Sequence, residues 1–131
     1  MGIFSSLFGL KNDPKPERPS TPKIPLAMLE DMFANMRLKS KWNVDGDLLW
    51  GYFFTDNDPY KLAPVAKYLS AEGYRIVQTY PTDDDTTHVL HVERIEHHTP
   101  HSLYDRNREL ETVATSFHIA SYDGMDVGAV L

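Results

Sequence analysis

The stretch Leu48–Phe54, LLWGYFF, decides the fold of this chain. It is uncharged and rich in aromatic side chains, which favour β-strands, and it is too short to be a buried helix. The turn signal Asp45-Gly46-Asp47 stands directly before it. We therefore expect a core strand to begin at this point.

The side chains of this strand alternate between the two faces of a sheet. Trp50, Tyr52 and Phe54 fall on one face, and Leu49, Gly51 and Phe53 fall on the other. Both faces are largely apolar, so something should cover the second face as well as the first. The candidates are a helix predicted upstream, over residues 25–38, and a second copy of the chain, which would make a homodimer.

The residues before this strand divide into two parts. Residues 25–38 have apolar side chains at helical spacing behind Pro25, which suits a first turn. Ahead of them, residues 1–10 carry an apolar stripe, and five of the nine prolines lie between Pro14 and Pro25. We expect residues 1–24 to be an amphipathic segment on a proline-rich tether, and residues 25–131 to be the folded domain.

A second helix is predicted after the strand, with Asp58 as its N-cap and Pro59 at its first position. Gly73 suits a left-handed cap at its C-terminal end. Pro64 lies too deep for a regular first turn, so we expect the helix to start late or to kink there. The apolar side of this helix is formed by Leu62, Val65, Ala66 and Leu69.

Two further strands are predicted over residues 74–80 and 87–96, separated by Pro81 and the acidic loop Asp83-Asp84-Asp85. Their spacing predicts that they pair as a β-hairpin. In the second strand Leu90 and Val92 share one face, and Val89, His91 and Glu93 share the other. One of the two faces should therefore be more exposed than the other.

A long helix is predicted over residues 102–119, followed by a turn at Asp123-Gly124 and a short apolar strand. The charged side chains Arg106, Arg108, Glu109 and Glu111 should lie mostly on the exposed side of this helix. Right-handed crossovers then place both core helices on one face of a four-stranded antiparallel sheet. The chain is therefore predicted to be an α+β protein of ferredoxin-like βαββαβ fold with an additional N-terminal helix.

The 131 residues include no cysteine, which excludes disulfides, iron–sulfur clusters, thiolate-bound zinc and a cysteine nucleophile. No apolar run is long enough to span a membrane and no secretory signal is recognisable, so we expect a cytoplasmic protein. Of the net charge of −6, residues 1–23 contribute +2, which leaves −8 on residues 24–131. A surface this acidic repels nucleic acid phosphates, so we expect no direct nucleic acid contact and a basic protein as the partner.

The sequence contains no phosphate-binding loop, nucleophile elbow or HExxH helix, and we identify no catalytic, cofactor-binding or metal-binding residue. An alternative is a metal or pH-sensing site formed by Glu96, His91, His97, His98 and His101. A solvated loop is favoured instead, because Thr99 and Ser102 can cap a helix that starts there.

Two other features carry alternatives. The run Asp83-Asp84-Asp85 lacks the spacing of a calcium loop and favours a solvated turn. Met1-Gly2 followed by Ser6 fits the loose N-myristoylation pattern. A weak membrane contact through residues 1–10 stays open beside docking of that segment on a protein.

From Leu26 to Gly128 the sequence resembles the RraB family, the ribonuclease E inhibitor domain. The resemblance is carried by LLWGYFFTD at 48–56, AEGY at 71–74, ELETVATSF at 109–117 and YDG at 122–124. It implies a bacterial, cytoplasmic regulatory protein without catalytic activity of its own. Such a protein binds and inhibits an endoribonuclease of the ribonuclease E type and so modulates RNA turnover.

The resemblance marks Tyr122, Asp123 and Gly124 as the family signature, a turn that leads into the final strand. We expect these residues to be structural, because glycine readily takes the positive φ of a tight turn and tyrosine can pack across the sheet edge. An immunity-type module or another protein-interaction adaptor on the same fold is the alternative function.

Overall fold

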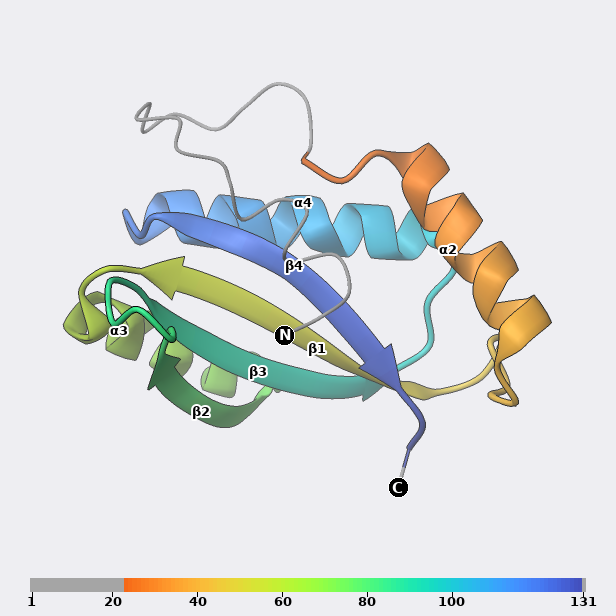
Figure 1. Ribbon diagram of the computed structural model, residues 1–131, viewed down its shortest axis with the longest axis horizontal. Coiled ribbons are helices and arrows are strands. Elements are labelled where there is room, and N and C mark those ends of the chain that lie inside the picture. Colours follow the sequence, from red (N-terminus) through yellow and green to blue (C-terminus); the bar gives the residue numbers. More distant parts are fainter. Residues whose placement is uncertain (1–22, 131) are drawn as a thin grey trace.

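The uncharged stretch forms β1, Leu48–Asp56, at an inner position of a four-stranded antiparallel sheet (Figure 1). The strand order is β2-β3-β1-β4. The computed structural model describes residues 23–130. The other elements are α2 Leu26–Lys39, α3 Pro59–Ala71, β2 Arg75–Pro81, β3 His88–Glu96, α4 Pro100–Ser116 and β4 Ser121–Gly128. The predicted α+β, ferredoxin-like arrangement is confirmed.

The expectations about an amphipathic segment, a tether, myristoylation and membrane contact concern residues 1–22, which lie outside the described residues. Within residues 23–130, no helix has both the length and the apolar character that crossing a membrane requires.

The core lies on the face of the sheet that α3 and α4 cover (Figure 1). Trp50, Tyr52 and Phe54 of β1 all belong to the main hydrophobic cluster and are at most 1% exposed. They meet Leu90 and Val92 of the neighbouring β3 in the same cluster. The alternation predicted for β1 therefore gives the core face correctly.

The helix α2 does not cover the second face of the sheet, so that prediction is wrong. It packs beside α4, and its Phe33 ring stacks on Trp50 with ring centroids 6.0 Å apart. The second face is less apolar around Gly51. A side chain at this position would contact the polar side chains of His91 and Asp126. A second copy of the chain on this face stays a prediction.

The helix α3 starts at Pro59 and runs through Pro64, so the predicted late start is wrong. The Asp58 side chain accepts a hydrogen bond from the Tyr60 amide at 2.9 Å, and Gly73 has a φ of 99°, as predicted for the two caps. Pro64 cannot donate to the Tyr60 carbonyl. The exposed position of Tyr60 lets water serve that carbonyl instead.

The helix α4 begins and ends earlier than the predicted residues 102–119. Thr99 and Ser102 form a reciprocal capping box that starts it at Pro100, and His118, with a φ of 57°, stops it after Ser116. Glu111 is 6% exposed, so its predicted place on the outer side is wrong. The Glu111 carboxylate instead accepts a hydrogen bond from the Lys23 amide at 3.1 Å.

The segment Tyr122-Asp123-Gly124 lies inside β4 and does not form a turn ahead of it, which corrects the prediction. Phe53 pairs with Gly124 and Phe54 pairs with Tyr122, so Asp123 is an extra residue in β4, as in a β-bulge. Gly124 has a φ of 118°, which other residues rarely adopt. The glycine thus serves the bulge.

Candidate functional site

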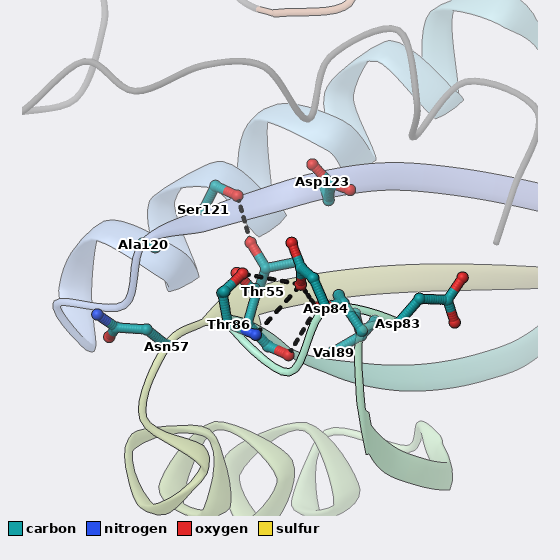
Figure 2. A pocket seen from close by; sticks show the side chains of 11 residues that line it. Thr55, Asn57, Asp83, Asp84, Thr86, Val89, Ala120, Ser121 and Asp123 are labelled. Carbon is teal, nitrogen blue, oxygen red and sulfur yellow. Dashed lines mark hydrogen bonds between the residues drawn. The ribbon is translucent and has the colours of Figure 1, made fainter.

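A hollow of about 650 Å³ lies at one end of the sheet. It forms where the β2–β3 hairpin loop, the end of β1 and the start of β4 meet (Figure 2). Its lining is Thr55, Asn57, Thr82, Asp83, Asp84, Thr86, Thr87, Val89, Ala120, Ser121 and Asp123. Hydroxyl groups and carboxylates dominate this set.

The hairpin loop is held by its own hydrogen bonds. The Thr82 amide donates to the Thr87 carbonyl at 2.8 Å. One carboxylate oxygen of Asp84 accepts from the Thr82 hydroxyl at 2.7 Å and from the Thr86 amide and hydroxyl at 3.1 and 2.9 Å (Figure 2). These bonds, the Thr82 hydroxyl first, hold the pKa of Asp84 below its usual value. The loop therefore presents an ionised carboxylate on a defined backbone.

The floor of the hollow joins β1 to β4. The hydroxyls of Thr55 and Ser121 are 2.7 Å apart and share a hydrogen bond (Figure 2). Close to it, the Asp56 carboxylate accepts from the Ala120 amide at 2.8 Å and approaches Lys61 at 3.6 Å. Asp56 is thus paired, in contrast to Asp123.

Asp123 is the unusual member of the hollow. It is only 5% exposed, and no hydrogen bond joins its carboxylate to another group within residues 23–130. Burial raises the pKa of Asp123 to about 6, and the charge of Lys23 opposes the rise only in part. The bulge in β4 therefore places at the edge of the hollow a poorly solvated acid that no donor of residues 23–130 reaches.

The chemistry available in the hollow is that of a cation receptor. Of the lining side chains that belong to residues 23–130, three are carboxylates and none is a lysine, arginine or histidine. A metal ion is not the fitting cation, because no three histidine, aspartate or glutamate side chains between residues 23 and 130 are grouped so that they could hold one. An organic cation that takes several hydrogen bonds fits the hydroxyls and carboxylates better.

A second polar cluster is buried where β3 ends and α4 begins. The Glu96 carboxylate accepts from the Tyr52 hydroxyl at 2.6 Å and from Arg106 at 2.8 Å, and it lies 3.1 Å from Nε2 of His98. Nδ1 of His98 lies 2.8 Å from the Ser102 hydroxyl. Burial would raise the pKa of Glu96, but these hydrogen bonds and the Arg106 charge lower it to about 2.

This cluster resembles a catalytic arrangement only in its residue types. The Ser102 hydroxyl also accepts from the Thr99 amide at 2.8 Å, as part of the capping box of α4. His98 is 5% exposed and its ring packs edge-on against Trp50 at 5.2 Å. The Glu96, Tyr52, His98 and Ser102 side chains bond to other members of the cluster or to the capping box, so the cluster fixes the junction between β3 and α4.

The structure does not bring the predicted histidine cluster together. His98 is buried in the Glu96 cluster, whereas His97 and His101 are exposed. His91 lies on the second face of the sheet, where its ring stacks on Phe53 at 4.4 Å. The four side chains therefore do not form a site.

The three signature residues occupy different environments. The Tyr122 hydroxyl donates to the Asn107 side chain of α4 at 2.6 Å, and its ring lies 5.2 Å from Phe54 in the core. Gly124 serves the bulge, and Asp123 lines the hollow. The hairpin acids and Asp123 could each be identified in the sequence, but their meeting could not, because it depends on β1 lying between β3 and β4.

The chain matches a known protein family. The family model named RraB and described as "Regulator of ribonuclease activity B" matches residues 27–127, which covers every strand and helix of the structure apart from the end residues of α2 and β4. None of the curated proteins compared with the chain matches it.

Proposed function

The chain belongs to the RraB family of regulators of ribonuclease activity, and from this premise we propose that it binds an enzyme of the ribonuclease E type and lowers its cleavage of RNA. In this proposal the chain acts in the cytoplasm, catalyses no reaction itself and leaves the RNA untouched. Its effect on RNA turnover comes from the protein contact alone.

One observation carries the proposal beyond the family match: the acidic hollow. It gathers Asp83, Asp84 and Asp123, and the described part of the chain adds no basic residue to its lining. Residues 24–131 together carry a net charge of −8. Such a surface attracts a basic protein and repels RNA. Binding to the enzyme rather than to its substrate is therefore the route that the charges favour.

The test is a cleavage assay with purified ribonuclease E and a fluorescent RNA substrate, to which the full chain is added in increasing amounts. We expect the initial rate to fall to a plateau as the chain saturates the enzyme, and a complex of the two proteins to elute together in gel filtration. The chain incubated with RNA alone should leave the RNA intact and unshifted in a native gel.

Two results would contradict the proposal. Full-rate cleavage at a chain concentration that saturates binding would remove the inhibitory role. A chain that shifts the RNA and lowers cleavage without binding the enzyme would replace protein contact by substrate capture.

A further inference from the structure

We propose that the acidic hollow receives an arginine side chain of the ribonuclease partner, whose guanidinium group is bound between Asp123 and the carboxylates of the β2–β3 hairpin loop. This inference rests on the proposed function, because it names the chemical group through which the partner is recognised. The residues concerned are separated along the chain and meet only through the strand order (Figure 2).

Asp123 lies in an unusual environment for an acid. The residue is only 5% exposed, and a carboxylate on so buried a residue ordinarily accepts hydrogen bonds or faces a cation at contact distance. Asp123 accepts no hydrogen bond from residues 23–130, although the Lys23 ammonium group lies close enough to bond the neighbouring Tyr122 carbonyl at 3.0 Å. Within the described residues, the acceptor capacity of Asp123 is therefore left for a donor from a partner.

The acceptors of the hollow suit a donor of a particular shape. A guanidinium group carries five N–H donors in a planar fork and keeps its charge at every physiological pH. Hydroxyl oxygens of Thr55 and Ser121 and the carboxylates of Asp83 and Asp84 line the same hollow as Asp123. Acceptors spread over several elements fit a fork better than the compact ammonium group of lysine.

The environment of Asp123 also separates recognition from folding. Because Asp123 is buried and accepts no hydrogen bond from residues 23–130, its charge does not stabilise the fold of those residues. Its replacement by the isosteric asparagine should leave the fold intact or stabilise it, while removing the charge that would bind the partner. A loss of binding in Asp123→Asn can thus not be blamed on unfolding.

The test measures the Kd of the full chain for purified ribonuclease E by surface plasmon resonance, for the wild type, Asp123→Asn, Asp83→Asn and Asp85→Asn. Asp85 is the matched control, since it lies in the same exposed loop but does not line the hollow. Asparagine also tolerates the φ of 59° that Asp85 adopts. We expect Asp123→Asn to raise Kd by at least about tenfold, Asp83→Asn by a few-fold, and Asp85→Asn by less than twofold.

A second measurement uses a short arginine-rich peptide as the probe, with citrulline and lysine versions as controls, and follows the backbone amides of the full chain by NMR. We expect the arginine peptide to shift the amides of Thr55, Thr86 and Ser121 most, the citrulline peptide to shift none, and the lysine peptide to bind more weakly. Asp123→Asn should abolish these shifts.

The outcomes distinguish this inference from the proposed function. If the wild type does not bind ribonuclease E, the proposed function fails, whatever the peptide does. If the wild type binds and inhibits but Asp123→Asn and Asp83→Asn bind as tightly, the function stands and the arginine site is refuted. Binding that is lost on deletion of residues 1–22 and unaffected by Asp123→Asn would also refute it, in favour of the N-terminal segment as the contact.

Discussion

Asp123 is a residue whose ionised side chain lowers the stability of the fold, although the β4 bulge holds it at a defined position. Burial raises its pKa to about 6, so at neutral pH the folded chain must hold a charge that its surroundings disfavour. The cost is present only where the group is ionised. It should therefore appear as a pH dependence of stability.

The variant Asp123→Asn tests this directly. The folded chain holds its proton up to about pH 6, whereas an unfolded aspartate loses it near its usual value of 3.8, so wild-type stability should decline as pH rises between these two values. We expect the variant to match the wild type near pH 4 and to be more stable by about 2 kcal/mol at pH 8. Urea unfolding at both pH values measures the difference, and a variant less stable than wild type at pH 8 would show that the ionised carboxylate is stabilised after all.

Glu96 predicts the opposite pH dependence. Its pKa of about 2 in the folded chain lies below the usual 4.5, so its contribution to stability should be complete above pH 4.5 and be lost as pH falls toward 2. We expect Glu96→Gln to cost about 2–3 kcal/mol at pH 7, because Arg106 and the Tyr52 hydroxyl lose their charged acceptor, and to cost far less near pH 2. Glu109→Gln, which removes the exposed partner of Arg106, is the control and should change stability by less than about 0.5 kcal/mol.

The sequence identifies these residues better than it places them. Tyr122, Asp123 and Gly124 stand out as a motif, yet the motif suggests a turn, whereas the register of β4 against β1 makes it a bulge. A β-bulge cannot be predicted from the sequence of one strand, because it is defined by the pairing register between two strands. The same limit hides the Glu96 cluster, whose members Tyr52 and Arg106 come from different elements.

At the scale of elements, α3 contains a proline, Pro64, at a position where regular helix geometry disfavours proline. Pro64 is the sixth residue of the helix and is exposed, so no packing contact explains it. We expect Pro64→Ala to raise the free energy of unfolding by about 1–2 kcal/mol, because alanine restores the bond to the Tyr60 carbonyl and avoids the ring clash. Thermal unfolding followed by circular dichroism measures the gain.

Pro59 provides the control for this prediction. It occupies the first position of α3, where the missing amide hydrogen has no intrahelical partner and the fixed φ suits the helix. Pro59→Ala should therefore leave stability unchanged or lower it slightly. Equal gains from both substitutions would mean that loss of proline rigidity, and not helix geometry, is being measured.

Element boundaries were predictable where one residue determines them. Asp58 and Gly73 give both ends of α3 because a cap needs only its own side chain or backbone freedom. The sequence predicts the end of α4 too late, because Phe117 continues the apolar spacing of the helix. In the structure Phe117 lies just after the helix and packs against Tyr68, with ring centroids 5.6 Å apart. Glu111 was misplaced because its partner, the Lys23 amide, lies 88 residues away.

At the scale of the whole molecule, the order β2-β3-β1-β4 creates the candidate site. It brings the hairpin loop near residue 84 beside the start of β4 near residue 122, with the end of β1 between them (Figure 2). The fold class followed from periodicity and connection rules, which concern each element and its neighbours. To predict the hollow, one must also know the spatial order of the strands. One must know as well which side of each strand faces outward.

The same scale decides where the folded unit begins. Ile24 is 2% exposed within the main hydrophobic cluster, and Lys23 bonds α4 through its amide and β4 through its ammonium group. We therefore propose that the domain starts at Lys23, two residues ahead of the boundary that the proline pattern favours. The prediction compares deletion of residues 1–22 with deletion of residues 1–24.

The shorter deletion should leave the melting temperature nearly unchanged, because residues 23–130 keep every contact described above. The longer one should cost about 2–4 kcal/mol, since it removes the Ile24 side chain from the core and leaves the buried Glu111 without the Lys23 amide. Ile24→Ala in the full chain should reproduce most of that loss. If both deletion variants melt at the wild-type temperature, residues 23 and 24 belong to the tether. The apolar contacts of Ile24 then do not contribute to the stability of the domain.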